Sequence, residues 1–218
     1  MHAPLFQLKT YFREANLAGL QTLLANYPEF ANEGIPFDDN NPAKAHPLHR
    51  ICDSVFEKKY TEAQALALAQ LFLAAGAHVN GFGLQEKQDT PLIAAASLHV
   101  DALALLYLQN GAEIHHPGTH GGTALHWAAW CSRAKVVQQL IEMQADVHKK
   151  CIDFQSTPLF WAVHGLKNSE NPDRLQYAAC IQLLIEAGAD KNVPNAEGTT
   201  IFELLNDADA TLKALLHS

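Results

Sequence analysis

The stretch GGTALHWAAW, residues 121–130, combines a turn signal with the start of a short helix. Thr123 is a suitable N-cap, because its hydroxyl can accept a hydrogen bond from a free amide of the first helical turn. Leu125, Ala128 and Ala129 follow at helical spacing and form a narrow apolar stripe of small residues. The stretch therefore predicts a turn followed by a capped helix whose small residues face the core.

Related phrases recur along the chain in the same order. Versions of the opening phrase read HPLHRIC, DTPLIAAA, STPLFWAV and TTIFELL and start at His46, Asp89, Ser156 and Thr199. A second phrase follows most of them and reads AAGAHVN, QNGAEIH, EMQADVH and EAGADKN, starting at Ala74, Gln109, Glu142 and Glu186. Its Gly, where present, can supply the left-handed C-cap of a preceding helix. Each unit is therefore predicted to hold a short helix, a turn, a longer helix and a loop.

The threonines Thr90, Thr123 and Thr157 are 33 and 34 residues apart. This period and the Thr-Pro-Leu-His-x-Ala pattern resemble the ankyrin repeat family, and the resemblance covers nearly the whole chain. It implies an all-α solenoid of stacked helix-turn-helix units with hairpin loops, because one unit alone cannot bury its apolar face. We expect one domain over residues 1–218 with about six repeats, at 4–32, 33–80, 81–115, 116–148, 149–192 and 193–218.

The two terminal repeats lack the full signature and suit capping repeats, which indicates a complete small protein. Two internal repeats are longer than the others, and the excess lies between their helices, at residues 53–63 and 165–177. Each segment holds a helix-start signal, Thr61 in the first and Asn171 to Asp173 in the second. We expect longer helices there, joined by an extended loop.

Composition and charge exclude several classes of function. The chain has 23 acidic and 15 basic residues, a formal net charge of −8 and no basic cluster, so we expect no nucleic-acid partner. No stretch reaches the roughly 18 apolar residues that span a bilayer, so we expect no membrane partner. The four cysteines form no C-x-x-C pair and are typical of reduced thiols, which predicts a cytoplasmic protein, with a secreted effector as the alternative. We also expect a monomer.

Four histidines lie within residues 115–126, where binding of a metal or small ligand is an alternative function. The resemblance, however, implies that His126 bonds neighbouring loops, and no Cys or carboxylate lies at ligand spacing. Cys131 follows His126 by five residues, which is not a facing separation on a helix, and no third group orients a base. We expect no enzymatic activity, no cofactor and no metal.

The resemblance implies a non-catalytic scaffold that holds a protein or peptide partner in a concave groove and with its hairpin loops. The three tryptophans of the chain fall on adjacent repeats, beside the core stripe. Aromatic anchors with a polar rim are typical of interaction hot spots. The predicted partner-binding residues of the first helices are Asp53, Ser97, Trp127, Trp130, Trp161 and His164. For Trp127 and Trp161 the alternative is packing against the neighbouring first helix.

The hairpin tips are a second predicted surface, because several apolar side chains stand where a solvated tip is usually polar. The predicted contact residues there are Phe82, Leu84, Asp153 and Phe154. The alternative for the apolar ones is that they fold back onto neighbouring loops. A further alternative function is a structural subunit that self-associates through residues 63–75 or the inserted loops.

Overall fold

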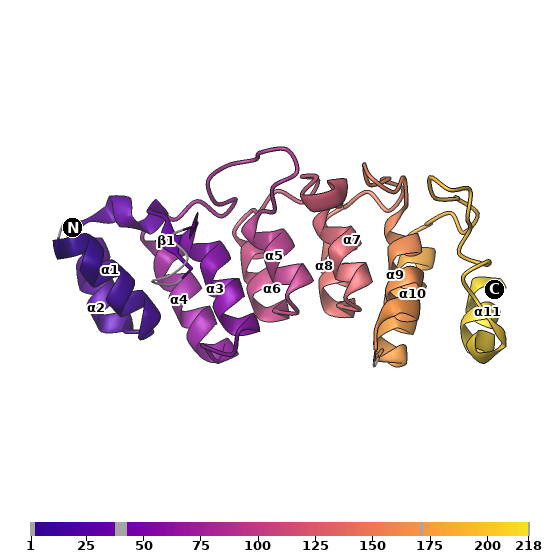
Figure 1. Cartoon of the computed structure of the whole chain (residues 1–218), viewed down its shortest axis with the longest axis horizontal. Helices are drawn as coiled ribbons and strands as arrows, with labels where there is room; N and C mark the ends of the chain where they lie inside the picture. Colours follow the sequence, from indigo (N-terminus) through magenta and orange to yellow (C-terminus); the bar gives the residue numbers. More distant parts are fainter. Residues whose placement is uncertain (1–2, 38–42, 171, 218) are drawn as a thin grey trace. The chain divides into compact units, whose positions relative to one another are not determined.

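The structure is a computed structural model that describes residues 3–37, 43–170 and 172–217. Its α-helices are α1 (Ala3–Arg13), α2 (Leu17–Asn26), α3 (Pro47–Phe56), α4 (Glu62–Ala74), α5 (Pro91–Ser97), α6 (Asp101–Gln109), α7 (Ala124–Trp130), α8 (Ala134–Glu142), α9 (Pro158–Asn168), α10 (Arg174–Glu186) and α11 (Ala210–His217). The short 3-10 helices are η1 (Pro28–Asn32), η2 (Thr119–Gly121) and η3 (Asp207–Asp209). Two-residue strands β1 (Ile35–Pro36) and β2 (Lys44–Ala45) pair antiparallel. The expected all-α fold is confirmed (Figure 1).

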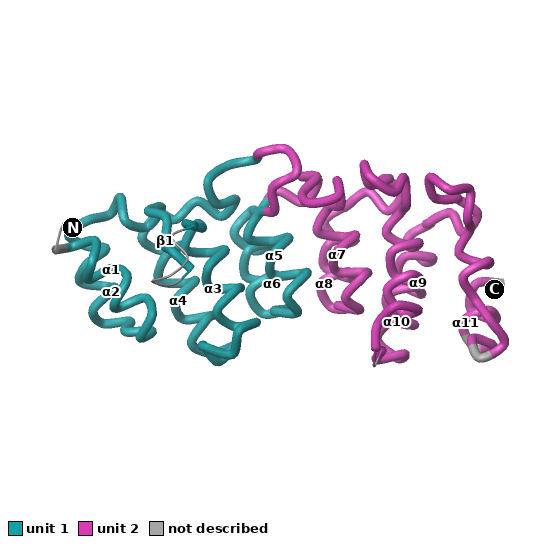
Figure 2. The backbone as a smooth tube through the Cα atoms, in the orientation of Figure 1, with its two compact units in different colours: residues 1–84, 90–112 teal, residues 85–89, 113–218 magenta. Residues whose placement is uncertain are grey.

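The chain forms two compact units, residues 1–84 with 90–112 and residues 85–89 with 113–218 (Figure 2). We call them unit 1 and unit 2. In unit 1 the helices pair as α1 with α2, α3 with α4 and α5 with α6, and α3 also packs on α5. In unit 2, α7 pairs with α8 and α9 with α10, while α7 packs on α9 and α8 on α10. Each unit therefore contains stacked helix pairs, and in unit 2 the single helix α11 packs on α10. The helix expected at the phrase that starts at Thr199 is not formed, because residues 201–204 make turns.

The first helices α5, α7 and α9 begin at the predicted threonine caps. The Oγ1 atoms of Thr90 and Thr157 accept hydrogen bonds from the amides of Ile93 and Phe160, at 3.4 and 3.3 Å. At Thr123 the cap is different, because the imidazole is the acceptor: the Thr123 amide donates to Nδ1 of His126 at 3.1 Å. The His of the motif therefore closes its own helix start, a detail that the threonine alone did not predict.

The small-residue stripe lies in the core, as expected: Leu125, Ala128 and Ala129 are fully buried. In unit 1 the second helix α6 is tied to α3 by Tyr107, whose buried hydroxyl donates to the carbonyl of Leu48 at 2.8 Å. Because these stripes are narrow, neighbouring first helices can approach closely, and this approach positions the site described below.

The two long repeats do contain longer helices. The first helices α3 and α9 have 10 and 11 residues against 7 in α5 and α7, and the second helices α4 and α10 have 13 against 9 in α6 and α8. The expected extended loops are wrong, because helix takes up most of the added residues and leaves as connections only 57–61 and, among the described residues, 169–170 and 172–173. Thr61 and Asp173 cap the helices that follow, and Asn171 lies outside the described residues.

No helix in the described part of the chain combines the length and apolar character needed to cross a membrane.

Candidate functional site

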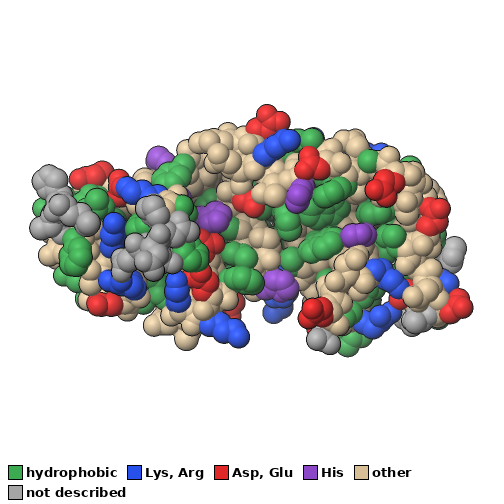
Figure 3. Space-filling view, viewed as in Figure 1, with side chains coloured by type: hydrophobic (Ala, Val, Ile, Leu, Met, Phe, Trp, Pro, Cys, Tyr) green, Lys and Arg blue, Asp and Glu red, His purple; other side chains and the backbone are tan. Residues whose placement is uncertain are grey.

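A cavity of about 410 Å³ opens in unit 2 between the first helices and the hairpin tips. We call it the aromatic pocket. The aromatic side chains that line it are Trp127, Trp130, Phe154, Phe160 and Trp161, so every tryptophan of the chain is at this one place. Figure 3 shows hydrophobic side chains gathered over this part of unit 2, with histidine and acidic side chains beside them.

Trp161 of α9 is the buried base of the pocket. Its ring centroid lies 5.1 Å from that of Trp127 and 5.9 Å from that of Trp130, with interplanar angles of 81° and 73°. Trp161 is 5% exposed, whereas Trp127 and Trp130 are half-buried. Phe154, 47% exposed, stands at the rim with its ring 6.3 Å from Trp161. The rings thus surround the cavity from several directions and do not fill it.

Two glycines allow α7 and α9 to bring these rings together. A Cβ atom on Gly165 would lie 2.4 Å from the backbone oxygen of Trp130, which is closer than carbon and oxygen can approach. A Cβ atom on Gly122 would lie 3.0 Å from the Trp161 ring and 3.3 Å from Nε1 of Trp127. The close approach of the two helices therefore depends on the absence of side chains at these two positions.

Hydrogen bonds between hairpin tips form the rim of the pocket. The amide of Asp153 donates to the carbonyl of His120 at 3.1 Å, and the amide of Ala196 donates to the carbonyl of Phe154 at 2.9 Å. The His120 ring lies 5.1 Å from the Phe154 ring, and its Nδ1 is 3.0 Å from Oδ2 of Asp153. Three successive tips are thus joined into one edge, and that edge carries the polar groups of the site.

The charge of the lining is negative. Glu197 is the acidic residue of the lining, and no Lys or Arg is among the described residues that line the pocket. Its carboxylate has no hydrogen-bond or ion-pair partner within the described residues, while its amide donates to Oδ1 of Asn195 at 3.0 Å. Burial lowers the pKa of His164 below its usual 6.5, so this imidazole is neutral at pH 7. The pocket is therefore aromatic, with one free carboxylate at its open edge.

His126, in the opening stretch, has a structural role. It is fully buried, and its Nε2 lies 3.2 Å from the carbonyl of Ser156, which joins α7 to the next hairpin. Burial lowers its pKa to about 4, so the ring is neutral, with Nε2 as donor and Nδ1 as acceptor for the Thr123 amide. This is the loop-bonding role that the family resemblance implied.

Neither metal binding nor thiol chemistry gains support at this place. Nε2 of His116 lies 2.9 Å from the carbonyl of Gln88, and His120 pairs with Asp153, so the histidines serve separate contacts. Over the described residues, no group of three or more His, Cys, Asp or Glu side chains could hold a metal ion. Burial raises the pKa of Cys131 to about 12, which keeps the thiol protonated and a poor nucleophile.

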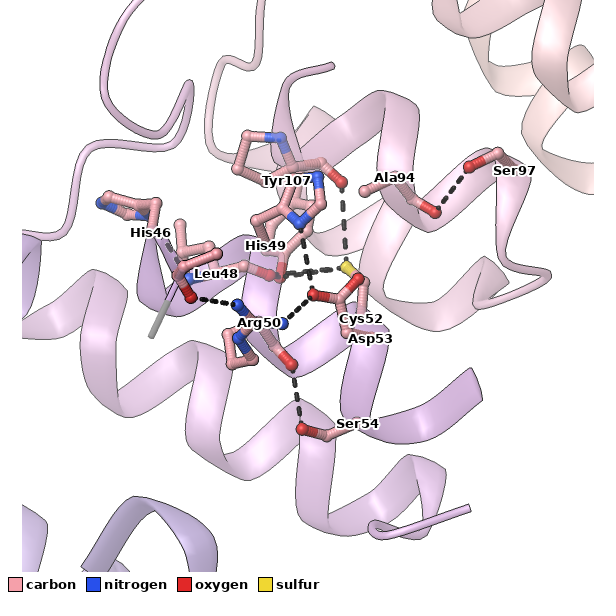
Figure 4. Close-up of polar contacts among 12 residues, drawn as sticks. His46, Leu48, His49, Arg50, Cys52, Asp53, Ser54, Ala94, Ser97 and Tyr107 are labelled. Carbon is pink, nitrogen blue, oxygen red and sulfur yellow. Dashed lines mark hydrogen bonds and ion pairs between the residues drawn. The ribbon is translucent and has the colours of Figure 1, made fainter. Parts of the chain in front are cut away.

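The remaining predicted contact residues lie in unit 1. Asp53 Oδ2 accepts a hydrogen bond from the Arg50 guanidinium at 2.7 Å, and the Ser97 hydroxyl donates to the carbonyl of Ala94 at 3.2 Å (Figure 4). Phe82 and Leu84 are exposed, at 55% and 51%. These four residues are not part of the aromatic pocket, and their role in binding stays a prediction.

The structure brings together five of the predicted residues, Trp127, Trp130, Phe154, Trp161 and His164, with Asp153 at the rim. Phe160 and Glu197 carry no signal in the sequence that marks them as contact residues, and His120 was considered only as one of the four histidines of the alternative metal or small-ligand site. The tips that carry His120 and Glu197 were recognised as a candidate surface. Nothing in their spacing indicates that Glu197 lines the same cavity as Trp127, which is 70 residues earlier.

Comparisons with known proteins agree with this architecture. Residues 59–151 match the model of ankyrin repeats (3 copies). Ankyrin repeat and SOCS box protein 6 of Mus musculus is 33% identical over 118 residues, which are 53% of this chain and 26% of that protein. Palmitoyltransferase Hip14 of Drosophila melanogaster is 28% identical over 97 residues, 44% of this chain and 14% of that protein. The E3 ubiquitin-protein ligase KEG of Arabidopsis thaliana is 29% identical over 126 residues, which cover 55% of this chain and 7% of that protein.

The chain thus spans 26% or less of the length of these relatives. The similarity concerns the repeats and does not extend to the activities in the relatives' names.

Proposed function

The chain is an ankyrin-repeat protein, and we propose that it binds a protein or peptide partner through the aromatic pocket of unit 2. Ankyrin repeats are generally protein–protein interaction modules, which supports a macromolecular partner and a role without catalysis. In this proposal Trp127, Trp130 and Phe154 contact the partner, and Trp161 supports them from below.

One observation carries the proposal: all three tryptophans of the chain surround a single open cavity. If these rings served the core alone, packing would bury them, yet Trp127 and Trp130 keep part of their surface exposed. Large rings that are rigid and partly exposed are enriched among the residues that dominate binding energies. The polar residues of the hairpin tips supply the rim that such hot spots have.

The test is a selection of peptides from a displayed random library on the full chain, followed by affinity measurements on variants. We expect Trp130→Ala to weaken the selected peptides at least tenfold, which corresponds to about 1.4 kcal/mol. The matched control is Leu175→Ala, which also removes an apolar side chain from unit 2 but at a position that is 83% exposed and outside the pocket. Equal affinities for the two variants, both folded by circular dichroism, contradict the proposal.

Phe82 and Leu84 in unit 1 are proposed as a separate contact, because both keep about half of their surface exposed. Their replacement by Ala tests this contact with the same peptides. We also propose that the chain is a monomer and lies in the cytoplasm, and the second of these is supported by four cysteines that are buried as thiols. Sedimentation that changes with protein concentration argues against the monomer.

A further inference from the structure

The aromatic pocket also has features that specify the charge of its occupant. We propose that it takes the methylated ammonium group of a lysine side chain in the partner peptide. This proposal rests on the function proposed above and adds the chemical class of the ligand.

The arrangement of the rings favours a cation as the occupant. The face of an indole carries negative electrostatic potential, and a cation within about 6 Å of the ring centroid is attracted to it. The planes of Trp127 and Trp130 are close to perpendicular to that of Trp161. An occupant of the cavity beside them therefore meets rings of more than one orientation, and Phe154 adds a further ring at the rim.

The charge of the lining also favours a cation. Glu197 brings a carboxylate that has no partner among the described residues, and no Lys or Arg lines the cavity there. His164 is neutral at pH 7, because burial lowers its pKa, and His120 has the carboxylate of Asp153 at 3.0 Å. A cation is therefore complementary to the pocket, and an anion is not.

Differences in hydration distinguish between the possible cations. An unmodified ammonium group is strongly hydrated and brings three donors that need acceptors. The pocket has few acceptors that are not already used: besides Glu197 its polar lining holds Ser156, Asn195 and the imidazoles of His120 and His164. Asn195 Oδ1 already accepts from two backbone amides, and Nδ1 of His120 lies 3.0 Å from Oδ2 of Asp153. Methyl groups replace donors with apolar surface and keep the charge, which suits walls made of rings. Arginine fits less well, because its guanidinium presents five donors.

The volume agrees with a side chain and its neighbours. The cavity of about 410 Å³ falls within the range of ~300–1,000 Å³ that is typical of ligand sites. It can hold the end of a lysine side chain together with part of the stem, while Phe154 and Trp130 at the opening contact flanking residues of the peptide.

The tryptophans make a direct test possible. Because all three line the pocket, the intrinsic tryptophan emission of the full chain reports on this site alone. We would titrate the chain with acetyl-Gly-Lys-Gly-amide in three forms: unmodified, trimethylated, and with the neutral tert-butyl isostere in which carbon replaces the nitrogen. The expected result is that the trimethylated peptide binds about tenfold more tightly than either of the others.

The isostere separates charge from shape, since it has the same outline and no charge. If it binds as tightly as the trimethylated peptide, the pocket is simply apolar and the proposal is wrong. Absence of binding of the trimethylated peptide, or equal binding of the unmodified one, also overturns it.

A second measurement uses a variant at the exposed Glu197, where a substitution is not expected to disturb the fold. Glu197→Gln keeps the shape of an exposed side chain and removes its charge, so we expect several-fold weaker binding of the trimethylated peptide and unchanged binding of the isostere. Glu170→Gln is the matched control, because Glu170 is an exposed acid of unit 2 outside the pocket. Equal effects of the two variants contradict a role for Glu197.

Failure of this ligand class is distinguishable from failure of the proposed function. Library peptides contain no methylated lysine. If they bind in a Trp130-dependent manner while the trimethylated tripeptide does not, the binding function stands and the ligand class is wrong. If neither binds at the pocket, both proposals are wrong.

Discussion

Equivalent positions on the first helices carry different side chains in the two units, and these side chains make different contacts. In unit 2 they are the tryptophans of α7 and α9, which leave an open pocket. In unit 1 the pair on α3 is Arg50 and Asp53, which bond each other at 2.7 Å (Figure 4). Arg50 is buried, and its guanidinium lies 4.8 Å from the ring centroid of Phe37.

The repeat framework therefore sets the positions of these side chains. Their chemistry decides whether they bond to one another within the unit or remain available to a ligand. A guanidinium beside a carboxylate finds its partner within the unit. The indole rings of unit 2 pack edge to face on Trp161 and do not cover one another's faces completely. They therefore leave aromatic surface that a ligand can cover. The following predictions test this contrast between a common framework and distinct surfaces.

The largest effect is expected where the two units are alike. Leu92 in unit 1 and Leu125 in unit 2 occupy the same position of the repeat and are fully buried. Replacement of either by Ala should lower the free energy of unfolding by about 2–5 kcal/mol, through lost burial and the cavity left behind. Urea denaturation of both variants is the measurement. A loss below about 1 kcal/mol in only one of them breaks the idea of a common framework.

The next largest effect is a loss of folding stability as pH falls. The folded-state pKa of His126 is about 4, lowered by burial, against about 6.5 in the unfolded chain. Well above pH 6.5 this imidazole is neutral in both the folded and the unfolded chain, so its contribution to the free energy of unfolding is fully present. As pH falls from 6.5 towards 4 the unfolded state binds the proton first, so up to about 3 kcal/mol of stability is lost.

Thermal melts between pH 7.5 and 4.5 measure this loss. His46 in unit 1 has the same lowered pKa of about 4, so both units should respond. His126→Gln, which cannot take up a proton, should give a flatter pH profile than the unmodified chain, and a profile of unchanged steepness contradicts the assignment.

The smallest effect tests the close approach of helices. Gly165→Ala in unit 2 places a Cβ against backbone at 2.4 Å, so α9 must move away from α7, at about 1–3 kcal/mol. Gly19→Ala in unit 1 is the comparison variant, since a Cβ there would meet the side chain of Tyr11 at 2.9 Å and not the backbone of another helix. We expect the first variant to be the less stable one and to change the tryptophan emission. Identical stabilities and unchanged emission mean that the pocket does not depend on Gly165.

Much of the fold could be predicted because its signals are local. Thr90 and Thr157 cap helices through contacts three residues away, and the stripe around Leu125 needs only helical periodicity. The long connections could not be predicted as well. Whether the chain continues a helix or leaves it at Phe56 or Asn168 depends on packing against neighbouring helices, which spacing does not contain.

The pocket could be predicted only in part for the same reason. Trp127, Trp130 and Trp161 were identified by their place beside the core stripe, but burial of Trp161 and exposure of Trp130 depend on how closely α9 approaches α7. The amide of Ala196 bonds the carbonyl of Phe154, and this contact between tips 42 residues apart brings Glu197 to the opening.

The sequence by itself determined the all-α repeat architecture, its helix caps and its buried stripe, because each depends on residues within one or two helical turns. It also determined that the tryptophans fall on adjacent repeats. Only the tertiary structure decided that they surround one cavity with a free carboxylate at its edge. Side chains from different repeats meet through helix packing and hairpin contacts. The distances between them cannot be predicted from the spacing of the residues in the sequence.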